Sequence, residues 1–281
     1  MRGISAGRGY AINDYVCHAG PRDRPFEERH GFFNIAVVVS GSFVYKTDGG
    51  KGLLHPGSLL LGNSGACFEC GHEHSTGDRC VSFQYEPAYF EELAASAAGR
   101  SDYRFPTGVL PANDALLPML AAAEAVASGA PLPSLQLEEL AVAVAEAVLG
   151  TTSGAGLEGA RGAGTSRSVG ARDAQRISEV LRYLELHADE PLVLEELAEV
   201  AGLSKYHFLR TFRGLVGRSP YQYLLMIRMR RAALALVRTA GPVSAIALEA
   251  GFGDLSTFHR RFREVFGVSP QAYRRQRGLF S

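Results

Sequence analysis

One segment of this chain occurs twice. The first copy, which ends at Tyr223, is ELAEVAGLSKYHFLRTFRGLVGRSPYQY, and the second, which ends at Tyr273, is AIALEAGFGDLSTFHRRFREVFGVSPQAY. Each copy contains a glycine turn between two short segments whose apolar residues recur at helical spacing. The repeat therefore predicts that residues 192–273 form two copies of one helix-turn-helix unit.

The two copies differ in the length of the turn. Before it they align at an offset of 49, which pairs Ala198 with Ala247, and after it at an offset of 50, which pairs Phe208 with Phe258. The second turn is therefore expected to be one residue longer. Because the second helix of such a unit commonly enters the DNA major groove, a tandem pair favours DNA binding.

The second helix of each unit is expected to be amphipathic. Phe208 and Phe212 are four residues apart and share one side, and Phe258 and Phe262 repeat this spacing. The residues expected to contact DNA from the opposite side are Tyr206, Leu209, Arg210 and Arg213 in the first unit and Ser256, His259, Arg260 and Arg263 in the second. Arginine can hydrogen-bond guanine O6 and N7 or hold a phosphate. A solvated helix face is the alternative, but two homologous faces favour DNA contact.

The charge of the chain is divided between its two halves. Residues 172–281 contain 17 Arg and Lys against 11 Asp and Glu, a net charge of +6, whereas residues 1–171 contain 12 against 18, a net charge of −6. A basic half can neutralise DNA phosphates, while an acidic half would be repelled by them. The division therefore supports DNA binding by the C-terminal half.

Composition divides the chain into three parts. Residues 150–171 are rich in Gly, Ser, Thr and Ala without apolar periodicity, which predicts a flexible linker. We expect a sensor and dimerisation domain over residues 1–149 and a DNA-binding domain over residues 172–281. The chain is long enough for these domains to have separate cores.

The N-terminal part is expected to combine strands with helices. Residues 32–61 alternate apolar strands with Gly and Pro turns, which predicts a β-sandwich or small barrel, and residues 113–128 and 134–149 have helical periodicity. An apolar stripe follows the last of these helices at Leu137, Leu140, Ala141, Val144 and Val148. The stripe predicts either a lid on the strands or, as we prefer, a dimer interface.

The C-terminal part is expected to be entirely helical. Ser204 is a suitable N-cap for the first DNA-contacting helix, and Pro220 suits the start of a long helix over residues 221–237 that joins the two units. The arginines of this connecting helix are expected to make salt bridges or phosphate contacts, with at least one in a structural salt bridge: Arg228, Arg230 and Arg231.

Cysteine and histidine gather in the segment ACFECGHEHSTGDRCVSF. Cys70, His72 and His74 would point to the same side of a strand, and a turn would return Cys80 beside them. These four side chains are suited to zinc or another thiophilic metal, with Cys67 as a spare or substitute ligand. A redox-active thiol pair and a purely structural cluster remain as alternatives.

The sequence also indicates a cellular compartment. It has no apolar run of roughly 20 residues that would span a bilayer, and its first residues lack the apolar stretch of a secretory signal. We therefore expect a cytoplasmic protein with no membrane partner. In that reducing compartment the four cysteines are expected to be thiols or metal ligands.

Residues 176–277 resemble the DNA-binding domain of the AraC (arabinose-operon regulator) family of bacterial transcription factors. The resemblance is carried by EELAEVAGLSKYHFLRTFR, then SPYQYL, then AIALEAGFGDLSTFHRRFREVFGVSPQAYR. It implies a seven-helix domain that contacts bases in two successive major grooves through Tyr206, Leu209 and Arg210 and through Ser256, His259 and Arg260. Gly253 stands where the family more often has a capping Ser or Asp. Residues 1–149 resemble, in outline, the cupin-like sensor domain common in this family.

The expected fold is therefore α+β with two domains, an N-terminal cupin-like β-barrel with appended helices and a C-terminal all-α tandem helix-turn-helix domain. We expect a transcription regulator, not an enzyme, whose N-terminal domain senses a metal, a redox state or a small molecule. The expected partners are promoter or operator DNA, RNA polymerase and a second copy of the chain. A cupin-type metalloprotein or enzyme with a DNA-binding tail is the alternative.

Overall fold

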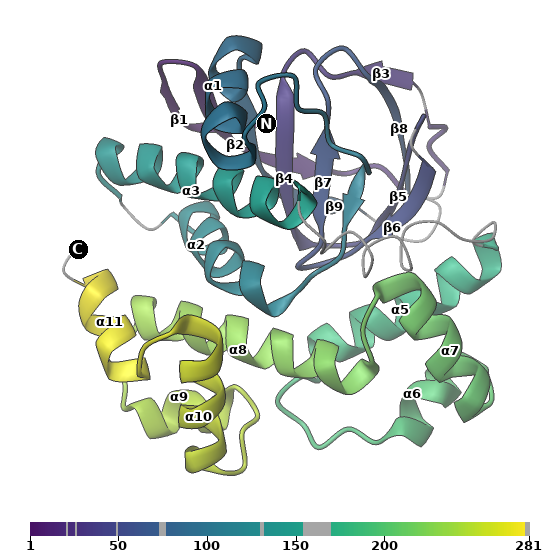
Figure 1. The fold of residues 1–281 in the computed structure, drawn as a ribbon. Helices are drawn as coiled ribbons and strands as arrows, with labels where there is room; N and C mark the ends of the chain where they lie inside the picture. The colour runs from purple at the N-terminus through teal and green to yellow at the C-terminus, as the bar shows by residue number, and fades with distance from the viewer. Residues whose placement is uncertain are drawn as a thin grey trace.

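The computed structural model describes residues 1–20, 22–25, 27–48, 50–72, 77–129, 132–153 and 170–278. Its N-terminal region, residues 1–153, contains two β-sheets and the helices packed on them, and its C-terminal region, residues 170–278, is helical (Figure 1). This arrangement confirms the predicted α+β class. None of the helices in the described ranges combines the length and apolarity that a membrane crossing requires.

The strands form two antiparallel sheets. The larger sheet contains, in order, β1 (Arg2–Gly7), β2 (Tyr10–Cys17), β9 (Asp78–Tyr85), β4 (Phe33–Ser40), β7 (Leu59–Gly62) and β10 (Val109–Leu110). The smaller sheet contains β3 (Glu27–Arg29), β8 (Cys67–Gly71), β5 (Phe43–Thr47) and β6 (Gly50–Leu54). Among the described residues the two sheets face each other as a sandwich, without the closed hydrogen-bonded ring of a barrel.

The larger sheet separates two apolar layers because side chains alternate along each strand. On β9, Val81, Phe83 and Tyr85 face the helices and join the main core. Cys80 points the other way, into a smaller cluster between the sheets that also contains Phe43. The space between the sheets is therefore lined by the less apolar side of β9, which carries Ser and Gln.

Three helices cover the outer face of the larger sheet (Figure 1): α1 (Pro87–Ala98), α2 (Leu117–Ala127), which follows the 3-10 turn η1 (Asp114–Leu116), and α3 (Ser134–Ser153). The apolar stripe of α3 faces this core. Ala141, Val144 and Val148 are almost fully buried within the chain, and the Tyr85 hydroxyl donates to the Ala141 carbonyl. The stripe is therefore a lid, and the preferred interpretation as a dimer interface is wrong for these residues because they have no surface left to offer.

The C-terminal region contains seven helices in its described residues, as the family resemblance implied: α5 (Ala171–Leu186), α6 (Leu194–Val200), α7 (Lys205–Val216), α8 (Pro220–Arg238), α9 (Val243–Glu249), α10 (Leu255–Phe266) and α11 (Pro270–Gly278). The pairs α6–α7 and α9–α10 are the two repeated units. Residues 201–204 separate the first pair and residues 250–254 the second, which confirms the longer second turn.

The second turn approaches the end of α5 closely. Gly251 has a φ of +89°, and a Cβ atom at this position would lie 2.7 Å from the Ala188 carbonyl oxygen. A larger residue would therefore be strained both in its backbone and in its contacts. This glycine fixes how the second unit packs against the rest of the helical region.

The helix starts differ in part from the prediction. Pro220 is the first residue of α8, and Ser219 and Gln222 form a capping box there. Ser204 does occupy the N-cap of α7, but its side chain caps no backbone amide. At α10 the N-cap is Asp254, whose carboxylate accepts a hydrogen bond from the Thr257 amide at 2.7 Å. The start of α10 is therefore capped although Gly253, the residue before Asp254, has no side chain to do so.

The two regions do not have separate cores. The Tyr223 hydroxyl of α8 donates to the Pro56 carbonyl at 3.2 Å, and the His55 and Tyr223 rings lie 5.3 Å apart. One cluster of buried apolar residues continues from the N-terminal helices into α8. Helix α8 lies beside α2 (Figure 1). The prediction of independent cores is wrong because the apolar residues of α8 pack toward α2 as well as toward its own region.

The predicted linker is shorter at both ends. Residues 150–153 continue α3, and Ala171 begins α5. Residues 154–169 lie outside the described residues. The N-terminal strands β1 to β3 and helix α1 were not predicted, because their sequence patterns are short or mixed and do not indicate a strand or a helix in isolation.

Candidate functional site

Helices α7 and α10 present matching faces. The rings of Phe208, Phe212, Phe258 and Phe262 are fully buried, so they fix the rotation of each helix as the spacing predicted. The opposite faces are turned away from the core. Each predicted contact residue therefore lies on the outer side of the second helix of its unit.

The eight predicted DNA contacts vary in exposure. Tyr206 is 86% exposed. Leu209 and His259 are half-buried, and each directly follows a buried phenylalanine in its helix. The remaining five are exposed: Arg210, Arg213, Ser256, Arg260 and Arg263.

The two helices differ in their electrostatics. On α10, Glu264 lies 3.3 Å from Arg260 and 3.1 Å from Arg261. The equivalent position on α7 is Gly214, and neither Arg210 nor Arg213 makes an ion pair within the described part of the chain. Helix α7 therefore offers unpaired guanidinium groups, whereas α10 offers arginines partly neutralised by a carboxylate.

The arginines of α8 have structural roles. Arg228 donates to the carbonyls of Ala188 and Glu190 at 2.6 and 2.8 Å, and Arg231 donates to the Glu185 carbonyl. Arg230 is 5% exposed. It forms ion pairs with Glu124 and Glu185. These confirm the prediction that at least one of the three arginines makes a structural salt bridge.

A cavity of about 400 Å³ lies between the two sheets. Its wall on the larger sheet is polar: the Ser82 hydroxyl donates to Asn34 Oδ1 at 2.7 Å, and Gln84 Nε2 donates to the Tyr15 hydroxyl at 3.2 Å. The rest of the lining combines apolar rings, among them Phe68, with charged side chains such as Glu28 and Arg29. A cavity that combines apolar rings with polar groups has the character of a small-molecule site.

A buried histidine lies at the side of this cavity. His30 Nε2 is 2.7 Å from the Tyr45 hydroxyl, and the His30 ring stacks on Phe68 with centroids 4.1 Å apart. Burial lowers the pKa of His30 to about 4 and raises that of Tyr45. Both groups are therefore neutral near pH 7, and they supply hydrogen bonds instead of charge.

Sulfur and imidazole groups gather at one end of the cavity. Cys70, His72 and Cys80 all line it. Period-two alternation predicted a common side for Cys70 and His72, and a turn was expected to bring Cys80 beside them. His74 lies outside the described residues, and Cys67 is not among the lining residues. Burial raises the pKa of both Cys70 and Cys80, with the nearby Asp78 charge as a second cause.

Two members of this cluster, Cys17 and Asp78, were not predicted from the sequence. Cys17 lies in β2 directly opposite Asp78 in β9, and both line the cavity with His72. Asp78 Oδ1 is 2.6 Å from His72 Nε2, and Cys80 Sγ lies 3.4 Å from Asp78 Oδ2. The strand that carries Cys17 was not identified in the sequence, so nothing there linked Cys17 to the Cys and His segment.

Comparisons with known proteins agree with the helical geometry. A model of the helix-turn-helix domain family matches residues 197–276. The chain is 39% identical over 99 residues to the right origin-binding protein of Escherichia coli K12, which covers 35% of this chain and 34% of that protein. It is 35% identical over 101 residues to the transposon Tn10 TetD protein of Escherichia coli, which covers 36% of this chain and 73% of that protein.

Some solved structures are similar to part of the chain. A transcriptional regulator from Chromobacterium violaceum, described as containing an AraC-type DNA-binding domain, is 29% identical, covers 36% of this chain and 91% of that chain, and has a TM-score of 0.35. The chain belongs to the AraC-type family of helix-turn-helix proteins. It spans about a third of the length of the first curated relatives it matches, and the similarity lies in the C-terminal region.

Proposed function

We propose that this protein is a sequence-specific DNA-binding transcription regulator. The observation that carries the proposal is the matched pair of outward faces on α7 and α10, each backed by two buried phenylalanines. Two such helices held by one connecting helix are suited to two successive major grooves. In this proposal Tyr206, Leu209 and Arg210 contact bases from α7, and Ser256, His259 and Arg260 do so from α10, with Arg213 and Arg263 beside them.

The proposal assigns distinct roles to the two regions. Residues 172–281 are the DNA-binding domain, and residues 1–149 are a sensor of the cupin-like type whose cavity binds an effector. The polar wall and the volume of the cavity support a small molecule or a metal as that effector. Because α8 packs on the N-terminal region, an effector that changes this packing would alter the DNA affinity.

We further propose that the protein acts in the cytoplasm, as a homodimer, on promoter or operator DNA and with RNA polymerase as a partner. A dimer would use a surface other than the buried stripe of α3. A cupin-type metalloenzyme with a DNA-binding tail is the second candidate, favoured only by the Cys, His and Asp cluster. We favour a regulator that is not an enzyme because the family relatives are named as regulators or DNA-binding proteins.

Selection of bound duplexes from a random pool by the full-length chain, followed by electrophoretic shift measurements, tests this function. Arg210→Ala and Arg260→Ala should each weaken the selected site by about 1–3 kcal/mol and relax preference at particular base pairs. Arg100→Ala, an exposed arginine of the N-terminal region, is the control. If both variants bound every sequence more weakly by the same factor, the two arginines would contact phosphates and not bases. If no sequence were selected from the pool, the proposal would be contradicted.

A further inference from the structure

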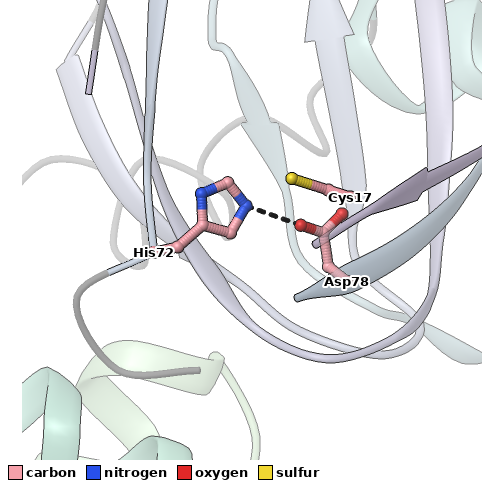
Figure 2. Close-up of side chains that lie close together, drawn as sticks. All are labelled: Cys17, His72 and Asp78. Atoms are coloured by element: carbon pink, nitrogen blue, oxygen red, sulfur yellow. Dashed lines mark hydrogen bonds and ion pairs between the residues drawn. The ribbon is translucent and has the colours of Figure 1, made fainter. Parts of the chain in front are cut away.

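Three strand ends meet at the edge of the cavity. Cys17 is the last residue of β2, His72 follows β8, and Asp78 is the first residue of β9. The side chains point toward one another (Figure 2), and their sulfur, nitrogen and oxygen atoms lie within 4.8 Å of each other. The His72 and Asp78 side chains are 8% and 7% exposed. The larger sheet supplies two of these groups and the smaller sheet the third.

The backbone holds this arrangement in place. Cys17 and Asp78 are register partners in adjacent strands, so their separation is set by the sheet. Gly77, which precedes Asp78, has a φ of +105°, and a Cβ atom there would lie 2.4 Å from the Cys17 carbonyl oxygen. A glycine is therefore required for β9 to begin this close to the end of β2.

The electrostatic surroundings favour a cation. The only ion pair that Asp78 makes within the described ranges is with His72. Nearby acidic groups add negative potential: beyond the effect of burial, the charges of Asp78, Asp23 and Glu28 raise the pKa of the Cys17 thiol. A bound divalent cation would offset the free-energy cost of burying the negatively charged Asp78 carboxylate near other acidic groups.

We propose that Cys17, His72 and Asp78 bind a thiophilic divalent metal of the zinc or cobalt type, with Cys80 as the fourth ligand. A thiolate, an imidazole and a carboxylate together suit Zn²⁺ or Co²⁺, whereas Mg²⁺ and Ca²⁺ prefer oxygen alone. Cys80 lies on the same side of β9 as Asp78, with its Sγ 3.4 Å from Asp78 Oδ2. It is not one of the three groups whose ligand atoms lie within 4.8 Å of one another, so its side chain would have to move closer to become the fourth ligand. Tetrahedral ligation separates ligand atoms by about 3.3 Å, so His72 and Asp78 need to open from 2.6 Å by only a side-chain rotation.

This ligand set differs from the one that the sequence pattern predicts. It keeps His72 and Cys80, replaces Cys70 and His74 by Cys17 and Asp78, and leaves out Cys67. The inference deepens the proposed effector role, but it concerns metal binding alone and is measured without DNA. Failure to bind DNA would therefore leave it standing, and failure to bind metal would leave the DNA-binding proposal standing.

The test is a titration of the metal-free, full-length protein with Co²⁺ in the absence of DNA. We expect one Co²⁺ per chain, with thiolate-to-cobalt charge-transfer absorption and tetrahedral d–d bands that disappear when Zn²⁺ is added. Cys17→Ser and Asp78→Asn should each weaken binding at least about tenfold. Cys67→Ser, which removes a half-buried thiol outside the cavity, should not change it.

Alkylation of the unaltered protein gives a second measurement that does not depend on the folding of variants. Cys17 and Cys67 are both half-buried, so a thiol reagent should label both in the metal-free chain. Zn²⁺ should protect Cys17 and leave Cys67 reactive. A cobalt spectrum without thiolate absorption, or labelling of Cys17 that Zn²⁺ does not change, would overturn the proposal. Loss of binding in Cys70→Ser and His74→Ala but not in Cys17→Ser would assign the metal to the ligand set predicted from the sequence.

Discussion

The Nε atom of Arg230 lies 2.9 Å from Oε2 of Glu124, which joins helix α8 of the C-terminal region to helix α2 of the N-terminal region. The contact is an ion pair without the alignment of a hydrogen bond. Glu185 of α5 lies 3.2 Å from the same guanidinium. Burial alone would lower the pKa of Arg230, but the two carboxylates raise it, so the arginine stays charged. One buried cation thus connects three helices across the boundary between the regions.

Removing the carboxylate of α2 should destabilise the whole chain. Glu124→Ala leaves the buried Arg230 with Glu185 as its remaining partner, so we expect a loss of about 3 kcal/mol, at the lower end of the range for breaking a buried ion pair. Urea denaturation of the metal-free protein measures it. Glu138→Ala, an exposed glutamate of α3, is the matched control and should change stability by less than about 0.5 kcal/mol. Equal effects of the two variants would show that the contact contributes nothing.

The carboxylate on α10 should limit the affinity for DNA. Glu264→Gln frees Arg260 and Arg261 from their ion pairs and removes a negative charge from the proposed interface. We expect several-fold tighter binding at low salt and a smaller gain as the salt concentration rises, because screening weakens exposed charges. Fluorescence anisotropy with a labelled duplex at several salt concentrations checks this. Glu91→Gln, an exposed glutamate of α1, should have no effect, and unchanged binding by Glu264→Gln would place α10 away from DNA.

The stripe of α3 should matter for folding and not for association. Leu137 is 8% exposed and Leu135, two residues earlier, is 66% exposed. Leu137→Ala should therefore cost about 2–5 kcal/mol of stability by opening a cavity, whereas Leu135→Ala should be nearly neutral. Thermal unfolding and light scattering at several protein concentrations separate the two roles. If Leu137→Ala changed only the monomer–dimer equilibrium, the stripe would be an interface after all.

Stability should fall in mildly acidic solution. His55 is 1% exposed, and burial, reinforced by the charges of Arg230 and Arg218, lowers its pKa to about 4 from an ordinary value of 6.5. The unfolded chain therefore binds the proton more tightly, so this contribution is complete above about pH 6.5 and is lost as the pH falls toward 4. Each such group changes the free energy of unfolding by up to about 1.4 kcal/mol per pH unit.

Urea midpoints at pH 7.5, 6 and 5 would measure this slope. His55→Asn should reduce the dependence of stability on pH. The remaining dependence should include the contribution of His30, whose pKa is also about 4. His207→Asn, at an exposed position of α7, should leave the slope unchanged. A His55→Asn protein with the full slope of the parent would assign the acid sensitivity to other groups.

Much of the helical region could be predicted from the sequence because its determinants are local. The phenylalanines at Phe208 and Phe212 set the buried side of α7 by their spacing alone, and the repeat at Phe258 and Phe262 confirmed it. The turn that contains Gly202 and the start of α8 at Pro220 were equally local. The cap at Asp254 was not predicted, because the family resemblance places the capping residue at Gly253, one position earlier. Aspartate is nevertheless a residue type that commonly caps helices.

Side chains that meet through sheet pairing or helix packing could not be predicted in this way. The period of two placed Cys70 of β8 and His72, which follows this strand, on one side, but the residues opposite them depend on which strands pair. Cys17 faces Asp78 only because β2 and β9 are neighbours in the larger sheet. The stripe of α3 likewise has the same periodicity whether it covers a sheet or a second chain.

The sequence by itself therefore determined the two helix-turn-helix units and the faces they present, because spacing, turns and helix starts act within a few residues. Tertiary structure alone decided that Cys17, His72 and Asp78 converge at one cavity and that Arg230 reaches Glu124. These contacts join segments far apart in the chain. They form because strand pairing and the burial of α8 against α2 bring those segments together, and the periodic pattern of each segment does not indicate which other segment it will contact.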